Sequence, residues 1–170
     1  MENHFLYVML SGIIQGLTEF LPISSSGHLI MIKDYFDYDI QDFSFEIMLH
    51  LGTVFSILIY YYSDIKNMLK PSTENINNAI LVLIACLPIS IFGLVFKDSI
   101  EQNFNDITYL PYTYLITTFA LFLTKFFNGK KELNIYIVSI MGIFQILALL
   151  PGISRSGITI STLLILGVNK

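Results

Sequence analysis

The sequence predicts an all-α, polytopic membrane protein with an inverted-topology repeat, two re-entrant helix–loop–helix hairpins and three full transmembrane helices. Three observations predict this class. The 170 residues are 54% hydrophobic and only 13% charged, whereas soluble domains are about 25% charged. Several apolar stretches are long enough to cross a bilayer, which takes about 20 residues. One motif also occurs twice, and a cluster of proline, serine and glycine interrupts each copy.

The repeat pairs SGIIQGLTEFLPISSSG at 11–27 with MGIFQILALLPGISRSG at 141–157, at a spacing of 130 residues. Positions 12–27 and 142–157 share eight identical residues without a gap, which in the first copy are Gly12, Ile13, Gln15, Leu17, Ile23, Ser24, Ser26 and Gly27. The copies differ at three chemically important positions. In the alignment of the two copies, Glu19 corresponds to Leu149, Ser25 to Arg155 and His28 to Ile158. One copy therefore carries a carboxylate and an imidazole, and the other carries the only arginine.

The apolar stretches divide the chain into two repeats. The predicted spans lie near 43–62, 78–96 and 109–127, and polar segments at 63–75, 97–106 and 128–134 follow them. We expect Pro88 to kink the second span, because proline removes a backbone donor and clashes with the preceding turn. A first hairpin at 5–34 and the three spans form the first repeat at 1–130, and a second hairpin begins the second repeat at 131–170.

The broken segments are interpreted as re-entrant hairpins. Backbone that leaves a helix at membrane depth must be buried in protein or line a watery cavity. Broken helices at corresponding positions of two repeats are the best indication in a sequence of a binding site within a membrane. Because three spans separate the hairpins, we expect them to enter from opposite faces and to meet near the midplane.

Charge indicates the orientation of the chain and its partners. Lys66, Lys70, Lys130 and Lys131 fall on one side of the membrane, and the other side is mostly acidic. By the positive-inside rule the lysine-rich side is cytoplasmic, so the first hairpin opens to the exterior. A net charge of −4 without a basic patch excludes nucleic acid as a partner.

The first copy carries most of the candidate chemistry. Ser11, Gln15 and Glu19 recur every four residues and form one polar helical stripe, which must face protein or water. Ser24, Ser25, Ser26, Gly27 and His28 follow at the break, where free N–H groups of a new helix suit an anion. Simple N-capping accounts for one serine. Beside Glu19, His28 is interpreted as an acid/base or nucleophilic partner.

The second copy supplies a cation. Arg155 is costly at membrane depth, and its planar fork suits phosphate oxygens. The alternative is a structural pair with Glu19. Ser154, Ser156 and Thr159 are further donors beside it. Glu46 and His50 share one face of the first span, where an interhelical hydrogen-bonded pair is favoured over metal binding. We expect Glu46 to line the cavity.

QGLTEFLPISSSGHL and PGISRSGIT strongly resemble the two signature motifs of the bacterial undecaprenyl-diphosphate phosphatase family, the bacitracin-resistance type, and FEIMLHLGT and FQILALLPG also fit. The resemblance implies removal of the terminal phosphate of undecaprenyl diphosphate at the outer face of the bacterial plasma membrane. This reaction recycles the lipid carrier for peptidoglycan precursors and gives bacitracin resistance.

The resemblance also implies roles for single residues. Glu19, Ser25, His28 and Arg155 match catalytic positions, and Gln15 stands where many members have a second glutamate. The substrate-binding set is Gln15, Ser24, Ser26, Gly27, Ser154, Ser156 and Thr159. In the expected mechanism Ser25 or a water attacks the terminal phosphorus, His28 accepts the proton and Glu19 orients His28 or a magnesium ion. Glu19 and the diphosphate would be the only ligands available to coordinate magnesium.

Two alternatives to an active enzyme are also compatible with the sequence. A polyprenyl-phosphate transporter or flippase would share the inverted repeats, and an inactive remnant would share the motifs. Two full repeats would reach to about residue 260, so we expect a partial sequence or a degraded gene. The other explanation is a short chain that completes its fold by association into a homo-oligomer.

Overall fold

The computed structural model describes residues 2–37, 43–104 and 106–169, and the regular structure within these ranges is helical apart from an isolated bridge between Lys131 and Val168. The all-α prediction is confirmed. The α-helices are α1 (Glu2–Thr18), α2 (Ser25–Tyr35), α3 (Phe43–Tyr60), α4 (Tyr62–Met68), α5 (Thr73–Phe104), α6 (Leu110–Leu123), α7 (Ile135–Phe144) and α8 (Arg155–Ile165). Short 3-10 helices are η1 (Ile107–Tyr109), η2 (Thr124–Phe126) and η3 (Gln145–Leu149).

Two helical segments among the described residues are long and apolar enough to cross a membrane, Thr73–Phe96 and Ile107–Phe126. They contain most of the predicted spans 78–96 and 109–127. The predicted span 43–62 is different, because the chain bends by 78° between α3 and α4. It counts as a third span only if this bent pair crosses the membrane as one unit. Pro88 lies inside α5, which continues past it.

The polar segments 63–75 and 97–106 contain more helix than the sequence analysis expected. In α4, Asp64 occupies the first turn and Lys66 the last, so both charges complement the helix dipole. In α5 the helix runs on to Phe104 because residues 97–104 include neither proline nor glycine. A polar composition therefore marked the end of the apolar span but not the end of the helix.

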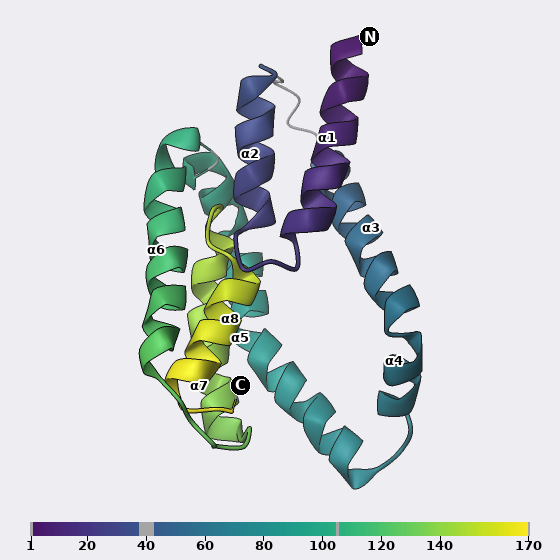
Figure 1. The fold of residues 1–170 in the computed structure, drawn as a ribbon, viewed down its shortest axis with the longest axis vertical. Coiled ribbons are helices and arrows are strands. Elements are labelled where there is room, and N and C mark those ends of the chain that lie inside the picture. The colour runs from purple at the N-terminus through teal and green to yellow at the C-terminus, as the bar shows by residue number, and fades with distance from the viewer. Residues whose placement is uncertain (1, 38–42, 105, 170) are drawn as a thin grey trace.

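The helices pack as two hairpins joined by longer helices. α1 packs against α2 and α3, whereas α7 packs against α5 and α8, and α6 packs against α8. Figure 1 shows that the α1–α2 hairpin and the α7–α8 hairpin open in opposite directions, with their connections overlapping near the middle of the molecule. The close contact between α5 and α7 depends on Gly142, where a Cβ atom would lie 2.7 Å from the carbonyl oxygen of Ala85.

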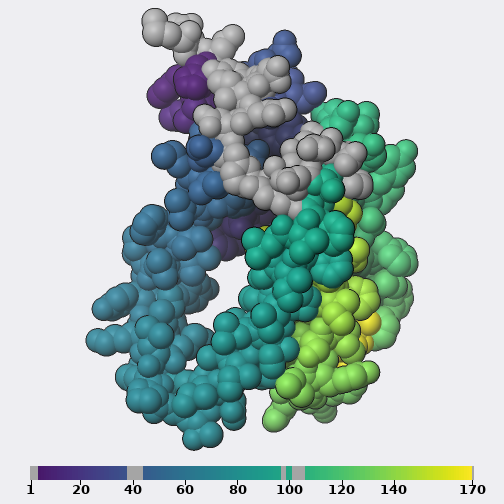
Figure 2. All heavy atoms as spheres, turned by 180° about the vertical axis from the view of Figure 1, so that it is seen from behind, coloured from purple at the N-terminus to yellow at the C-terminus, as the bar shows by residue number. Residues whose placement is uncertain are grey.

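Buried apolar side chains are few, and most large ones are exposed. A core cluster of Ala85, Val138 and Met141 lies between α5 and α7. By contrast, α3 and the first half of α5 expose apolar side chains along their length, and Figure 2 shows open space between the α3–α4 arm and α5. Such a surface is costly in water and suits the hydrocarbon interior of a bilayer.

Candidate functional site

The candidate site lies where the two broken segments meet. Ser156 Oγ donates to the carbonyl oxygen of Leu21 at 3.5 Å, which links the second break to the first. A Cβ atom on Gly27 would lie 3.0 Å from the Cα atom of Gly152, so the two backbones are in van der Waals contact. The tips of the two hairpins therefore touch, as the sequence analysis expected, and glycine at position 27 is required by this contact.

The second helix of each hairpin starts in the same way. Ser24 caps α2 and accepts from the backbone N–H of Gly27 at 3.4 Å, and Ser154 caps α8 and accepts from that of Gly157 at 3.1 Å. The second serine of each pair also contacts the cap, since Ser26 Oγ lies 3.3 Å from Ser24 Oγ and Ser156 Oγ lies 3.1 Å from Ser154 Oγ. The identical serines and glycines of the two motifs thus build two matching helix N-termini.

Ser24 is strained. Its φ of 67° lies in the left-handed region that L side chains rarely adopt, whereas Ser154 has φ −74°. In the second copy the left-handed residue is Gly152, with φ 89°. A non-glycine residue held in this region costs about 1–3 kcal/mol, so the first break stores strain that the second avoids by placing a glycine there.

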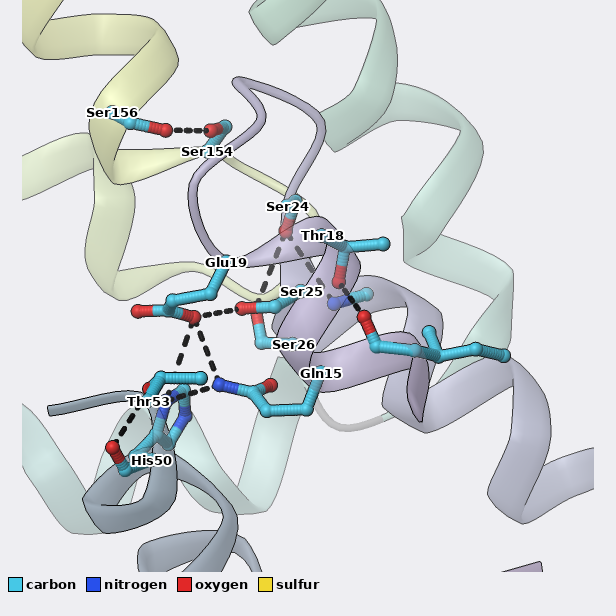
Figure 3. A network of polar contacts seen from close by, with 12 residues as sticks. Gln15, Thr18, Glu19, Ser24, Ser25, Ser26, His50, Thr53, Ser154 and Ser156 are labelled. Carbon is cyan, nitrogen blue, oxygen red and sulfur yellow. Dashed lines mark hydrogen bonds and ion pairs between the residues drawn. The ribbon is translucent and has the colours of Figure 1, made fainter. Parts of the chain in front are cut away.

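The carboxylate of Glu19 is the centre of the polar network in Figure 3. Its Oε2 atom accepts from Ser25 Oγ at 2.5 Å and from Gln15 Nε2 at 2.9 Å. The Nδ1 atom of His50 lies 3.5 Å from the same oxygen and 2.8 Å from Gln15 Nε2. The other carboxylate oxygen of Glu19 points away from this cluster (Figure 3), and the side chain is 32% exposed. One oxygen is held by the protein and one is open to a ligand.

The polar stripe on α1 faces the protein interior, which agrees with the sequence analysis. Ser11 and Gln15 are each 1% exposed. Among the described residues, Ser11 Oγ and Gln15 Oε1 are buried without a hydrogen-bond partner. Burying such an unpaired group costs about 1–3 kcal/mol, so this stripe is held in place despite a cost in stability.

His50 was not among the predicted site residues, but the structure places it in the site. It belongs to α3, which packs against α1. The expected interhelical hydrogen bond of the Glu46–His50 face is present, since His50 bonds Gln15. The Glu46 side chain is exposed on the surface of α3. A histidine within the apolar span 43–62 was the available signal, but the sequence does not show that α3 packs against the Gln15 face of α1.

The structure corrects the expected partner of His28. Its Nδ1 atom lies 2.7 Å from the carbonyl oxygen of Ser24 and 3.1 Å from the hydroxyl of Tyr114. His50, not His28, lies against Glu19. The reason is local, because position 28 is in the first turn of α2, where its ring folds back onto the N-cap residue. A carbonyl oxygen only accepts, so Nδ1 of His28 carries a hydrogen and donates it to the Ser24 carbonyl.

Tyr114 was also absent from the predicted site residues, although it lies in the predicted span 109–127. It lies on α6, and its ring meets the His28 ring edge-to-face with centroids 5.7 Å apart. A Cβ atom on Gly27 would lie 2.6 Å from its hydroxyl. Tyr114 therefore packs against Gly27 and His28 of the first break, from a helix that belongs to the last predicted span.

Arg155 is the first residue of α8, and its side chain is exposed. No carboxylate within the described ranges lies at ion-pair distance from its guanidinium, so the alternative of a structural pair with Glu19 is not formed. Thr159 Oγ1 donates to the Arg155 carbonyl oxygen at 2.8 Å, which turns this hydroxyl towards its own helix. Among the described residues, Arg155 is thus a cation at a helix N-terminus without a paired anion.

The described residues do not form a metal cage. No group of three or more His, Cys, Asp or Glu side chains in these ranges is arranged to hold an ion. Mg²⁺ prefers oxygen ligands and often binds through one or two carboxylates together with substrate phosphates. The open oxygen of Glu19 fits such a shared site, but a site built from protein alone does not fit.

Comparison with known proteins gives consistent similarities. A profile of the family described as Bacitracin resistance protein BacA matches residues 8–170. A protein named Undecaprenyl-diphosphatase from Thermosipho africanus is 38% identical over 168 residues, which cover 94% of this chain and 66% of the relative. The protein of that name from Halothermothrix orenii is 37% identical, covering 96% of this chain and 64% of the relative. The one from Saccharophagus degradans is 33% identical, covering 97% and 67%. The chain spans about two thirds of the length of the curated relatives it matches.

Proposed function

This chain belongs to the Bacitracin resistance protein BacA family, and from that premise we propose that it hydrolyses undecaprenyl diphosphate to undecaprenyl phosphate and inorganic phosphate. Relatives that carry the name Undecaprenyl-diphosphatase support the substrate class. The observation that carries the proposal is the contact between Ser25 Oγ and Glu19 Oε2 at 2.5 Å. It pairs a nucleophile with a base at a break in the helix.

In the proposed first step Ser25 Oγ attacks the terminal phosphorus in line with the bridging oxygen. The hydroxyl proton passes to Glu19 Oε2, which already accepts it in a hydrogen bond. The bond from phosphorus to the bridging oxygen breaks, and undecaprenyl phosphate leaves. A water then attacks the phosphorus of the phosphoserine and gives one proton to His28. The bond from phosphorus to Ser25 Oγ breaks, Oγ takes its proton back from Glu19, and inorganic phosphate leaves; His28 then releases its proton to solvent or to the phosphate. This assigns to Glu19 the base role that the sequence analysis expected for His28.

Charge on the transferred phosphoryl group is balanced by the second hairpin and by two helix ends. α2 and α8 both begin at the contact between the breaks, and helix N-termini favour anions. Arg155 has a planar fork that matches phosphate oxygens, and it is unpaired within the described ranges. In this proposal Arg155 binds the diphosphate and stabilises the transition state, while the serine caps position the backbone donors.

His28 has a separate task in the proposal. Because its Nδ1–H is fixed on the Ser24 carbonyl, its Nε2 lone pair can take a proton from the attacking water or return one to the phosphate products. Ser26 and Ser156, which lie beside the two caps, complete the substrate-binding set together with Gly27. The Thr159 hydroxyl donates to the Arg155 carbonyl instead, so it has no part in this set.

We propose that a divalent cation enters the site as a complex with the diphosphate. Glu19 would be its single carboxylate ligand, through the oxygen that is not bonded to Ser25. The cation would neutralise charge on the diphosphate. Gln15 donates to Glu19 and does not supply a second carboxylate. A chelator titration that leaves phosphate release unchanged would remove the cation from the account.

We further propose an inverted arrangement in the plasma membrane, with the first hairpin open to the exterior and both tips at membrane depth. The opposite directions of the two hairpins in Figure 1 and the matching caps support it. The lysine-rich segments near Lys66 and Lys131 lie on the cytoplasmic side in this arrangement.

The experiment that tests the function is phosphate release from undecaprenyl diphosphate by the purified protein in detergent. Detergent removes the second compartment, so a transporter or flippase gives no product in this assay. Release that rises with protein concentration supports the hydrolase. Tight binding of the lipid without release would support transport instead and would contradict the proposal.

A further inference from the structure

We infer that His50 is a positioning residue for the Ser25–Glu19 pair and that it acts through the amide of Gln15. The inference rests on the proposed function, because it assigns a task within the same site. His50 does not contact Ser25 in the network of Figure 3. The two residues are connected by successive hydrogen bonds, from His50 to Gln15, from Gln15 to Glu19 and from Glu19 to Ser25.

The orientation of the Gln15 amide follows from its neighbours. Its nitrogen lies 2.9 Å from Glu19 Oε2 and 2.8 Å from His50 Nδ1, whereas its oxygen is buried without a partner in the described part of the chain. If the amide were turned over, its oxygen would face the carboxylate oxygen at hydrogen-bond distance, and two acceptors repel. The two hydrogens of Nε2 therefore divide, one to the carboxylate and one to the imidazole.

This orientation fixes the tautomer of His50. Since Gln15 donates to Nδ1, that atom must present a lone pair, and the ring hydrogen is on Nε2. His50 Nδ1 and Glu19 Oε2 are then both acceptors, which accounts for their separation of 3.5 Å without a direct hydrogen bond. The opposite tautomer holds at His28, whose Nδ1–H donates to the Ser24 carbonyl.

The role of His50 follows from what its removal would free. Gln15 is 1% exposed with His50 in place, and a leucine at position 50 would keep this cover while offering the amide no acceptor. Without His50 the amide can rotate about its terminal bond, and its donor to Glu19 is no longer held. The Glu19 carboxylate would then keep Ser25 as its only firmly placed partner. His50 thus orients the Glu19 carboxylate and does not contribute to the affinity for the lipid.

A kinetic experiment separates this role from simple packing. We expect His50→Leu to lower kcat roughly tenfold with KM unchanged, because the lost contact orients the base and does not touch substrate. His50→Gln offers a carbonyl acceptor and should restore most of the activity. Ser56→Ala is the control, since Ser56 lies on the same helix and bonds only the carbonyl of Gly52 in the structure. An unchanged kcat in His50→Leu would overturn the inference.

The double variant tests the route through Gln15. If His50 acts through this amide, Gln15→Leu and His50→Leu should be strongly non-additive in kcat, because either change alone breaks the same connection. Additive losses would overturn the inference. Thermal stability of each variant, measured in the same detergent, identifies losses that come from unfolding.

A measurement independent of turnover keeps this inference distinct from the proposed function. In protein labelled with ¹⁵N-histidine, we expect His50 Nδ1 to give the resonance of an unprotonated ring nitrogen and His28 Nδ1 that of a protonated one. Gln15→Leu should shift the His50 resonance and leave that of His28 in place. A hydrogen on Nδ1 of His50, or no shift in Gln15→Leu, would overturn the inference. A wild-type chain that releases no phosphate but shows these resonances would contradict only the proposed function.

Discussion

Ser25 Oγ donates to Glu19 Oε2 at 2.5 Å across a break of six residues between α1 and α2. The carboxylate comes from the end of one helix and the hydroxyl from the start of the next. A continuous helix would place residues six apart on different faces, so the pair exists only because the helix is interrupted. The break that the motif predicted thus brings together the two groups to which we assign the reaction.

Loss of the base should be severe. We expect Glu19→Gln to lower kcat by about 10²–10⁴-fold, the range typical of a general base, because an amide keeps a similar shape but cannot take the Ser25 proton. Glu132→Gln, at an exposed position in the loop before α7, is the matched control. Phosphate release by the two variants in the same detergent is the measurement. Equal rates would remove Glu19 from the chemistry.

Arg155 should not be replaceable by lysine. We expect Arg155→Lys to lose about 10-fold or more in kcat/KM, because an ammonium offers no planar pair of donors to two phosphate oxygens. Arg155→Ala should lose more. Lys130→Ala removes a charge at another exposed position and should leave the rate in place. The account fails here if Arg155→Ala retains the wild-type kcat/KM.

The contact between the two breaks should be sensitive to a single methyl group. In Gly27→Ala the new Cβ atom would lie 2.6 Å from the Tyr114 hydroxyl and 3.0 Å from the Cα atom of Gly152. Overpacking of this kind costs about 1–3 kcal/mol, so we expect a lower melting temperature and lower activity. The measurement is thermal unfolding in detergent.

Gly16→Ala is the matched control for that experiment. It lies in α1, and a Cβ atom there would meet nothing within 4 Å. Alanine is favoured over glycine in a helix by about 1 kcal/mol, so this variant should be as stable as the wild type or more stable. A loss of stability as large as that of Gly27→Ala would contradict the proposed close approach of the two hairpin tips.

Tyr114 should affect the second half of the reaction more than the first. We expect Tyr114→Phe to lower turnover only about 2–10-fold, the worth of one hydrogen bond, because the Ser24 carbonyl still holds His28 Nδ1. Accumulation of phosphoserine in this variant, detected by mass spectrometry, would place the effect at the hydrolytic step. Slower formation of phosphoserine would place His28 in the first step instead.

Much of the fold was predictable because its signals are local. The repeated motif predicted two breaks, and each break forms the same serine cap, at Ser24 and at Ser154. Apolar length predicted the spans within α5 and α6. The bend of 78° after Tyr60 was not predicted, because the residues near 61 include neither proline nor glycine to mark it.

The site was predictable only in part, because only some of its signals are local in the sequence. Glu19, Ser25 and Arg155 stand out because a charge or a serine cluster is costly in an apolar segment. The partners of Glu19 and His28 depend on how distant helices pack, and the sequence does not give that. His50 reaches the site from α3 and Tyr114 from α6, so expectations from neighbouring positions paired Glu19 with the wrong histidine.

The most direct test of the central claim is the rate of phosphate release from undecaprenyl diphosphate by the wild-type chain and by Ser25→Ala. Ser139→Ala serves as the control, since Ser139 bonds only the Ile135 carbonyl of its own helix in the structure. The account predicts release by the wild type and by Ser139→Ala, and a rate at least about 100-fold lower for Ser25→Ala. Equal release by Ser25→Ala and the wild type would contradict it.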